Sequence, residues 1–82
     1  MSDVLRYLST VLSQNLDVVA EEIAPQATLD DLGVDSVATI ELVDILQEEY
    51  GIKIADEELT NKNTVEQVIE TVTAKVKARA GV

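Results

Sequence analysis

The hydrophobic residues of the first 15 positions follow the spacing of one helix face. They lie at i, i+4, i+7 and i+8 and are Val4, Leu8, Val11 and Leu12. This pattern predicts an amphipathic helix that ends at about Asn15. The pattern then stops, and the stretch from about 16 to 34 contains a proline, a glycine and the turn-like run TLDD. We expect a long connection there, and such a connection inside a compact domain is more often functional than accidental.

A second helical pattern begins at Asp35 or Ser36 and ends before Gly51, a residue type that is common just after a helix. Its apolar residues are expected to form a stripe of Val37, Ile40, Val43 and Leu46, with Leu42 and Ile45 beside it. A short helix is predicted for the run DEELTN, residues 56–61, with Asp56 as its N-cap.

The last predicted helix begins with the capping box TVEQ at 64–67. Its apolar stripe is Val65, Val68, Ile69, Val72 and Val76. The basic tail at about 77–82 is expected to fray. Because each longer helix has one apolar face to bury, we predict an all-α fold, a small four-helix bundle of three longer helices and one short helix. Residues 1–82 are expected to form a single domain.

The chain contains no cysteine and no histidine. The missing cysteine excludes a disulfide framework, a thiolate zinc site and a cysteine nucleophile. No apolar run approaches the roughly 20 residues of a membrane span. The N-terminus lacks the basic segment and apolar core of a signal peptide. We therefore expect a soluble cytoplasmic protein, and we expect it to be a monomer.

The acidic residues are concentrated in the middle of the chain, and the net charge is −10. From Asp17 to Glu58 there are 13 acidic residues and one basic residue, Lys53. Nucleic-acid binding requires the opposite sign of charge, so no nucleic-acid partner is expected. The acidic segment is either a solvated surface that keeps the domain soluble or a face that steers docking onto basic partners.

Ser36 stands where an acidic, glycine-containing loop turns into the second predicted helix. A nucleophilic serine needs a base, and the chain offers no histidine, no Ser-x-x-Lys pair and no G-x-S-x-G elbow at this position. A calcium loop of the EF-hand type that begins at Asp30 also fails, because Leu32 and Val34 would occupy ligand positions and Asp35 the position of the required glycine. We predict no catalytic residue and no metal site.

Two interpretations of Ser36 remain. It either caps the helix, a common role for serine, or it serves as an attachment point for another group. Asp35 has a side chain that can cap the helix itself, which would leave the Ser36 hydroxyl free. A phosphate ester at this position would lie at the positive end of the helix dipole, an interaction worth about 0.3–1 kcal/mol.

Three runs, LGVDSVATIELV, LQEEYGIKI and DEEL, follow one another in an order that resembles the acyl carrier proteins of fatty-acid and polyketide synthesis. The resemblance extends from the first predicted helix to the start of the last one. It implies a carrier and not an enzyme. Such a protein carries acyl intermediates as thioesters on a 4′-phosphopantetheine arm and delivers them to separate enzymes of fatty-acid or polyketide biosynthesis.

The resemblance also implies roles for single residues. Ser36 matches the serine to which a phosphopantetheinyl transferase attaches 4′-phosphopantetheine covalently from coenzyme A. Asp35 matches the acidic residue that caps the helix and contacts partner enzymes. The other implied partners are acyl-transferring and ketosynthase-type enzymes with basic docking surfaces. The residues expected to bind them are Glu41, Asp44, Glu48, Glu49, Asp56 and Glu57.

The family encloses part of its acyl cargo between the helices. The residues expected to line such a pocket are Val37, Ile40, Leu42, Leu46, Ile54, Leu59, Val65 and Val68. All of them are equally expected as ordinary core residues.

Three positions depart from the family pattern. Val37 replaces the usual leucine after the serine, Asp44 stands where fatty-acid carriers often have an exposed apolar residue, and Ala55 stands where proline commonly precedes the short acidic helix. These departures make a specialised carrier of a secondary pathway a comparable alternative. An aminoacyl carrier is a further alternative, and an acidic helical adaptor without a prosthetic group is the alternative from another class.

Overall fold

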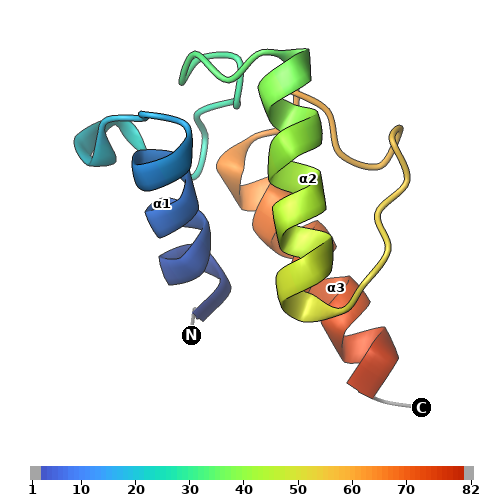
Figure 1. Ribbon diagram of the computed structural model, residues 1–82. Coiled ribbons are helices and arrows are strands. Elements are labelled where there is room, and N and C mark those ends of the chain that lie inside the picture. Colours follow the sequence, from blue (N-terminus) through green and yellow to red (C-terminus); the bar gives the residue numbers. More distant parts are fainter. Residues whose placement is uncertain (1–2, 81–82) are drawn as a thin grey trace.

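The computed structural model describes residues 3–80 of the chain (Figure 1). These residues form three α-helices, α1 (Asp3–Asn15), α2 (Ser36–Tyr50) and α3 (Val65–Ala80), and one short 3-10 helix, η1 (Ala20–Glu22). No strand forms within this range, where an isolated antiparallel bridge pairs Thr28 with Thr64. The prediction of an all-α fold, a small helical bundle, is therefore confirmed.

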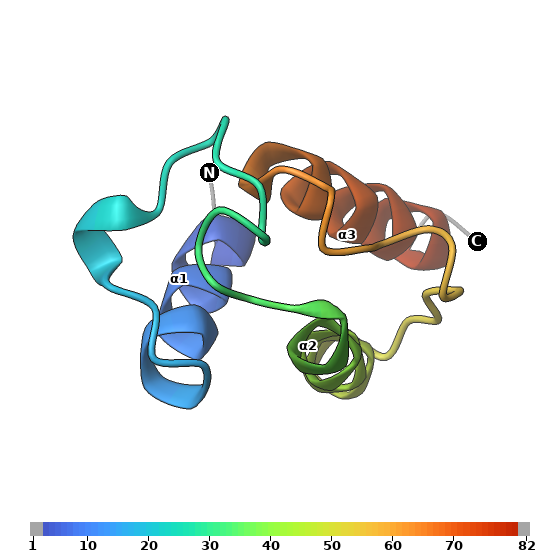
Figure 2. The same cartoon turned by 90° about the horizontal axis from the view of Figure 1, so that it is seen from above.

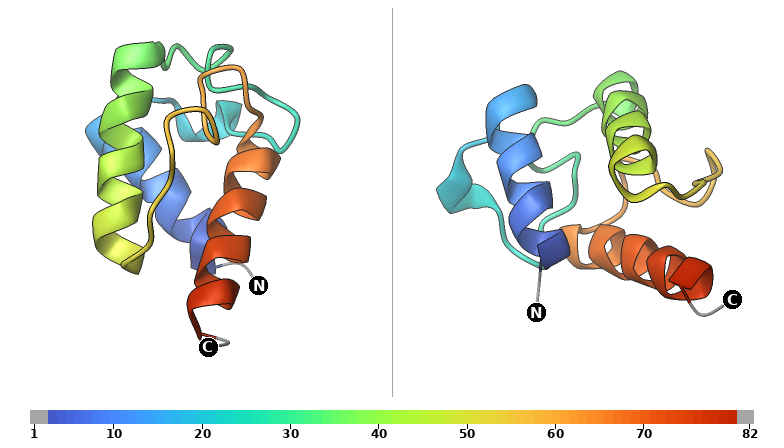
Figure 3. Two further views of the ribbon diagram at one scale, coloured as in Figure 1. Left: turned by 90° about the vertical axis from the view of Figure 1, so that its right-hand side faces the viewer. Right: turned by 60° about the horizontal axis from the view of Figure 1, so that its bottom comes forward.

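The three longer helices surround a common centre (Figure 2). α1 runs in the opposite direction to α2, whereas α3 runs in roughly the same direction as α2 (Figures 1 and 3). Each helix contributes fully or almost fully buried aliphatic side chains, among them Leu8, Leu12, Leu42, Leu46, Val68 and Val72. Burial of each such side chain stabilises the fold by about 1.5–3 kcal/mol. None of the helices in residues 3–80 has the length and apolar character needed to cross a membrane.

The bounds of α2 are set by its two caps, as the sequence predicts. At the N-terminus, Asp35 Oδ1 accepts a hydrogen bond of 2.8 Å from the backbone N–H of Ala38. At the C-terminus, Gly51 has a φ of 63°, in the left-handed region, and its N–H donates to the carbonyl oxygen of Gln47. A glycine adopts this conformation without the steric penalty that a side chain would add, so the helix ends there.

The core-facing side of α2 differs from the predicted stripe. The buried residues are Thr39, Leu42, Val43 and Leu46, whereas Val37 is 74% exposed and Ile40 is 59% exposed. The predicted stripe was correct for Val43 and Leu46 and wrong for Val37 and Ile40, because it used only steps of three residues. Positions 37 and 46 are nine residues apart, which is about 2.5 turns, so they lie on opposite sides of the helix.

The predicted capping box opens α3. Gln67 N–H donates to Thr64 Oγ1 at 3.1 Å, and Thr64 N–H donates to Gln67 Oε1 at 3.0 Å. The helix then continues to Ala80. The described part of the basic tail, 77–80, is thus helical, residues 81–82 lie outside the described range, and fraying of the tail stays a prediction.

The short helix predicted at 56–61 does not form. Residues 56–58 make a turn in which Glu58 N–H donates to the carbonyl oxygen of Ala55 at 2.9 Å. Glu58 Oε1 in return accepts from Ala55 N–H and from Lys75 Nζ, both at 2.8 Å. The Glu58 side chain ties this turn to α3. The backbone N–H groups of Thr60 and Lys62 bond to the side chains of Asn63 and Thr60, so the chain leaves the helical path there. The short helical element of the bundle is η1 instead.

The long connection before α2 is held against the loop that precedes α3. The backbone N–H groups of Leu29 and Asp30 donate to the carbonyl oxygens of Asn63 and Asn61, at 3.0 and 2.8 Å. Leu29 and Val34 are fully or almost fully buried and anchor the connection in the core. The start of α2 is therefore positioned by a rigid loop pair.

Candidate functional site

Ser36 is the first residue of α2, and its side chain is exposed. Asp35 caps the helix, so the interpretation of Ser36 as the cap was wrong. Within residues 3–80 the structure gives the Ser36 hydroxyl no hydrogen-bond partner. The hydroxyl is therefore free to act as the acceptor in a group transfer catalysed by another protein.

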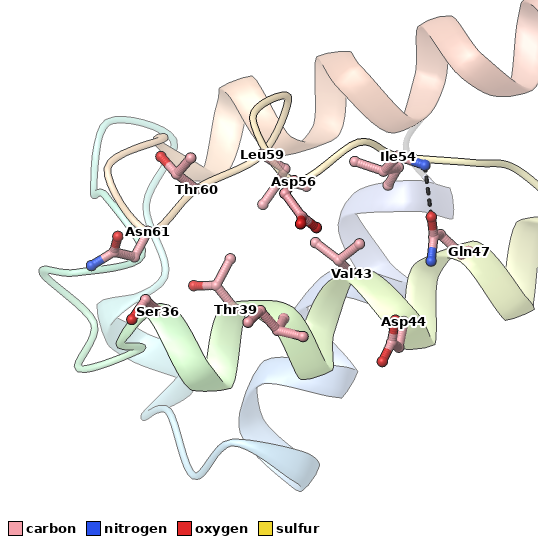
Figure 4. Close-up of a pocket in the computed structure, with 11 residues that line it drawn as sticks. Ser36, Thr39, Val43, Asp44, Gln47, Ile54, Asp56, Leu59, Thr60 and Asn61 are labelled. Atoms are coloured by element: carbon pink, nitrogen blue, oxygen red, sulfur yellow. Dashed lines mark hydrogen bonds between the residues drawn. The ribbon is translucent and has the colours of Figure 1, made fainter.

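A cleft of about 370 Å³ opens beside Ser36, between α2 and the loop that returns to α3 (Figure 4). Ser36 and Asn61 lie at one end of this cleft. At the other end, Gln47 Oε1 accepts a hydrogen bond of 2.7 Å from Ile54 N–H and joins the helix to the loop (Figure 4). The cleft thus has an entrance at the serine and a bridged far end.

Three of the predicted pocket residues line the cleft, namely Ile40, Ile54 and Leu59. Four others, Leu42, Leu46, Val65 and Val68, are fully or almost fully buried in the core and do not line it. Val37 lies on the exposed surface outside it. The structure therefore brings together only part of the predicted set.

The sequence analysis missed much of the cleft lining. The missed residues are Thr39, Val43, Gln47, Thr60 and Asn61. The helical ones could have been found from Ser36 itself, because positions three, seven and eleven residues later fall on the same side of a helix. The signal for Thr60 and Asn61 was weaker, since it depended on the path of the returning loop.

Three predicted partner-binding residues share the outer side of α2. Glu41, Asp44 and Glu48 are exposed, and they follow Val37 at helical spacings of four, seven and eleven residues. Asp44 also lines the cleft. We call Val37, Ile40, Glu41, Asp44 and Glu48 the outer face of α2. It combines two exposed aliphatic side chains with three carboxylates, and no ion pair within residues 3–80 involves those carboxylates.

The other predicted partner-binding residues lie elsewhere. Glu49 is directed toward α1, where Tyr7 packs edge-on against Tyr50 with ring centroids 5.7 Å apart. Burial, followed by the charge of Glu49 and a hydrogen bond to it, raises the pKa of Tyr7. Asp56 and Glu57 are exposed on the returning loop, and Asp56 reaches toward α2 over the cleft (Figure 4).

The chemistry of the site fits an attached phosphate ester. The hydroxyl of Ser36 is free, and the N–H groups at the start of α2 precede the first internal hydrogen bond of the helix. These groups and the helix dipole favour a negative charge at this position. An exposed serine without a hydrogen-bond partner, at the start of a helix and beside a cleft, is the geometry expected of an attachment point in a helical carrier domain.

Comparison with known proteins agrees with this class. The family model described as "Phosphopantetheine attachment site" matches residues 6–72. The chain is also 35% identical over 78 residues to the "Acyl carrier protein" of Thermosynechococcus vestitus (strain NIES-2133 / IAM M-273 / BP-1), an alignment that covers 94% of this chain and 96% of the relative. The chain therefore belongs to the acyl carrier protein family. Its cofactor is 4′-phosphopantetheine, and it is a carrier and not an enzyme.

Proposed function

We propose that Ser36 is the residue that receives 4′-phosphopantetheine and that the protein carries acyl intermediates between separate enzymes of fatty-acid or polyketide biosynthesis. The proposal rests on one observation at the start of α2: the helix cap and the free hydroxyl belong to two different residues. Asp35 supplies the cap, which leaves the Ser36 hydroxyl exposed and without a partner in the described range. When bound, the group supplies a thiol that holds acyl chains as thioesters.

The attachment step transfers 4′-phosphopantetheine from coenzyme A to Ser36, and it requires a base. The Ser36 oxygen forms the new ester bond to phosphorus, the phosphoanhydride bond of coenzyme A breaks, and the nucleotide part of coenzyme A leaves. The hydroxyl proton must pass to a base, and this chain has no histidine to accept it. We infer that a phosphopantetheinyl transferase supplies this base.

The outer face of α2 is the surface that we propose for partner binding. Its carboxylates Glu41, Asp44 and Glu48 are exposed beside the attachment serine, and they repel one another weakly along the helix. A partner with a basic surface relieves this repulsion and gains charge complementarity. The exposed aliphatic side chains Val37 and Ile40 lie on the same surface and add apolar area to the contact.

Attachment is tested by incubating the apo-protein with coenzyme A and a phosphopantetheinyl transferase of broad specificity. We expect the intact mass to rise by one phosphopantetheine group. Ser36→Ala is expected to abolish the gain, whereas Ser13→Ala, at a half-buried position of α1 outside the cleft, is expected to leave it unchanged. No gain in the wild-type protein would favour the acidic adaptor, and a gain in Ser36→Ala would place the group on another residue.

Asp44 is the residue that makes a specialised pathway a comparable alternative to the general fatty-acid pathway. It places a charge on the outer face of α2, where fatty-acid carriers often have an exposed apolar residue, and it also lines the cleft. The mass of the acyl group carried by protein from its native host would distinguish a saturated fatty-acid intermediate from a polyketide or aminoacyl cargo.

A further inference from the structure

The lining of the cleft beside Ser36 combines aliphatic and polar residues. Its apolar wall consists of Ile40, Val43, Ile54 and Leu59. The remaining lining residues, seven of eleven, carry polar or charged side chains. Among them, Asp56 reaches over the cleft from the loop, and Thr39 faces it from the helix (Figure 4).

Several of these polar groups retain hydrogen-bonding capacity. Thr39 is only 3% exposed, and its hydroxyl donates to the carbonyl oxygen of Asp35 at 2.8 Å, which leaves its lone pairs free to accept. Thr60 Oγ1 accepts from Lys62 N–H at 3.2 Å, and within residues 3–80 its own proton has no acceptor. Two residues that line the cleft, Thr39 and Thr60, therefore keep acceptor and donor capacity.

The far end of the cleft limits the length of the occupant. The hydrogen bond from Ile54 N–H to Gln47 Oε1 crosses from the loop to the helix. Gln47 is eleven residues after Ser36, so the distance along the helix axis is roughly 16 Å. The cleft volume of about 370 Å³ is near the lower end of ligand pockets, which begin at about 300 Å³.

We propose that this cleft selects short acyl groups that carry an oxygen substituent over saturated acyl groups of the same length. The proposal rests on the proposed function, because it concerns the cargo of the arm on Ser36. A saturated chain in the cleft would cover Thr39, Thr60 and Asp56 without offering them a hydrogen bond. A hydroxyl or oxo substituent pairs with these groups while the carbon chain rests on the apolar wall.

The test compares six-carbon cargoes on the same protein. A broad transferase loads the apo-protein from hexanoyl-, 3-hydroxyhexanoyl- or 5-oxohexanoyl-coenzyme A, and intact mass confirms each product. The rate of acyl transfer to an external thiol is then measured and divided by the rate for the matching acyl-pantetheine in solution. We expect at least one oxygen-bearing cargo to be protected about fivefold more than hexanoyl, the effect of one net hydrogen bond.

A matched pair of variants tests whether the extra protection depends on the cleft. Thr60→Val is expected to remove the extra protection, whereas Thr73→Val, on α3 and outside the cleft, is expected to keep it. Amide shifts of the wild-type protein give a readout that does not depend on any variant. We expect the signals of Thr39, Thr60 and Ile54 to move more with the oxygen-bearing cargo than with hexanoyl.

The outcomes separate this proposal from the one on which it rests. Equal protection of all three cargoes, or greater protection of hexanoyl, would overturn the selectivity. So would a Thr60→Val protein that is folded by its amide spectrum and still shows the full difference. A protein that accepts none of the three groups on Ser36 would instead contradict the attachment itself, and the mass measurement reveals this before any protection is measured.

Discussion

The two sides of α2 both carry aliphatic side chains, but the side chains of one side are buried and those of the other are exposed. On the inner side, Leu42 and Leu46 are fully or almost fully buried against the other helices. On the outer side, Val37 and Ile40 are exposed among carboxylates. The inner side stabilises the bundle, whereas the outer side gains little from folding. We propose that these exposed apolar residues, which lie beside Ser36, contact a partner protein.

The largest expected effect is a loss of stability when a residue on the inner side of α2 is truncated, compared with a truncation on the outer side. Leu46→Ala should lower the free energy of unfolding by about 2–5 kcal/mol, because it removes buried atoms and leaves a cavity. Val37→Ala should change it by no more than about 0.5 kcal/mol, because the side chain is already in water. Urea denaturation followed by circular dichroism measures both. Similar losses in the two variants would mean that the outer side also stabilises the fold.

A second expected effect concerns docking rather than stability. Reversing two charges, Glu41→Lys together with Glu48→Lys, should raise the KM of the phosphopantetheinyl transferase about tenfold at low salt, because the charges steer the encounter. The difference should shrink as salt screens the charges. The control is Glu66→Lys with Glu70→Lys, the same change of charge at exposed positions of α3. If both pairs raise the KM equally, only net charge matters and the outer face of α2 has no special role.

The smallest expected effect contrasts the unpaired acids of the outer face with Glu58, which is paired. A hydrogen bond from Lys75, followed by one from Ala55 N–H, lowers the pKa of the Glu58 carboxyl. Its contribution to stability is therefore present above the ordinary value of 4.5 and is lost as the pH falls through the lowered value.

The measurement is the difference in unfolding free energy between wild type and Glu58→Gln as a function of pH. This difference should be small and positive at neutral pH and should vanish in acid. Glu57→Gln, at the exposed neighbouring position, should show no such difference. A difference for Glu58→Gln that persists unchanged into acid would show that the ion pair with Lys75 is not its source.

Features with a local cause could be predicted from the sequence. The ends of α2 follow from the carboxylate of Asp35 and the positive φ of Gly51, and the start of α3 follows from Thr64 and Gln67. Each of these signals lies within a few residues of its effect, so that a single sequence is sufficient to show it.

Features that depend on distant contacts could not be predicted in the same way. The attachment of the turn at 56–58 to α3 depends on Lys75, which reaches Glu58 from 17 positions later in the chain. The prediction of which side of α2 faces the core failed for a different reason. Counting in steps of 3.6 residues would have placed Val37 on the solvent-exposed side of the helix. The cleft lining was difficult to predict for both reasons. One wall depends on which side of α2 faces the cleft, and the other depends on the path of the returning loop.

The hydrogen bond between Gln47 and Ile54 has a consequence for the evolution of such a protein. It connects the helix and the loop at the rim of the bundle, apart from the side chains that hold the helices together. We expect a substitution of Gln47 to remove this bond, and so to change the far end of the cleft, without removing any of the buried aliphatic side chains. Under the proposed function, evolution or protein engineering could therefore change the cargo through Gln47 while the core of the bundle stays the same.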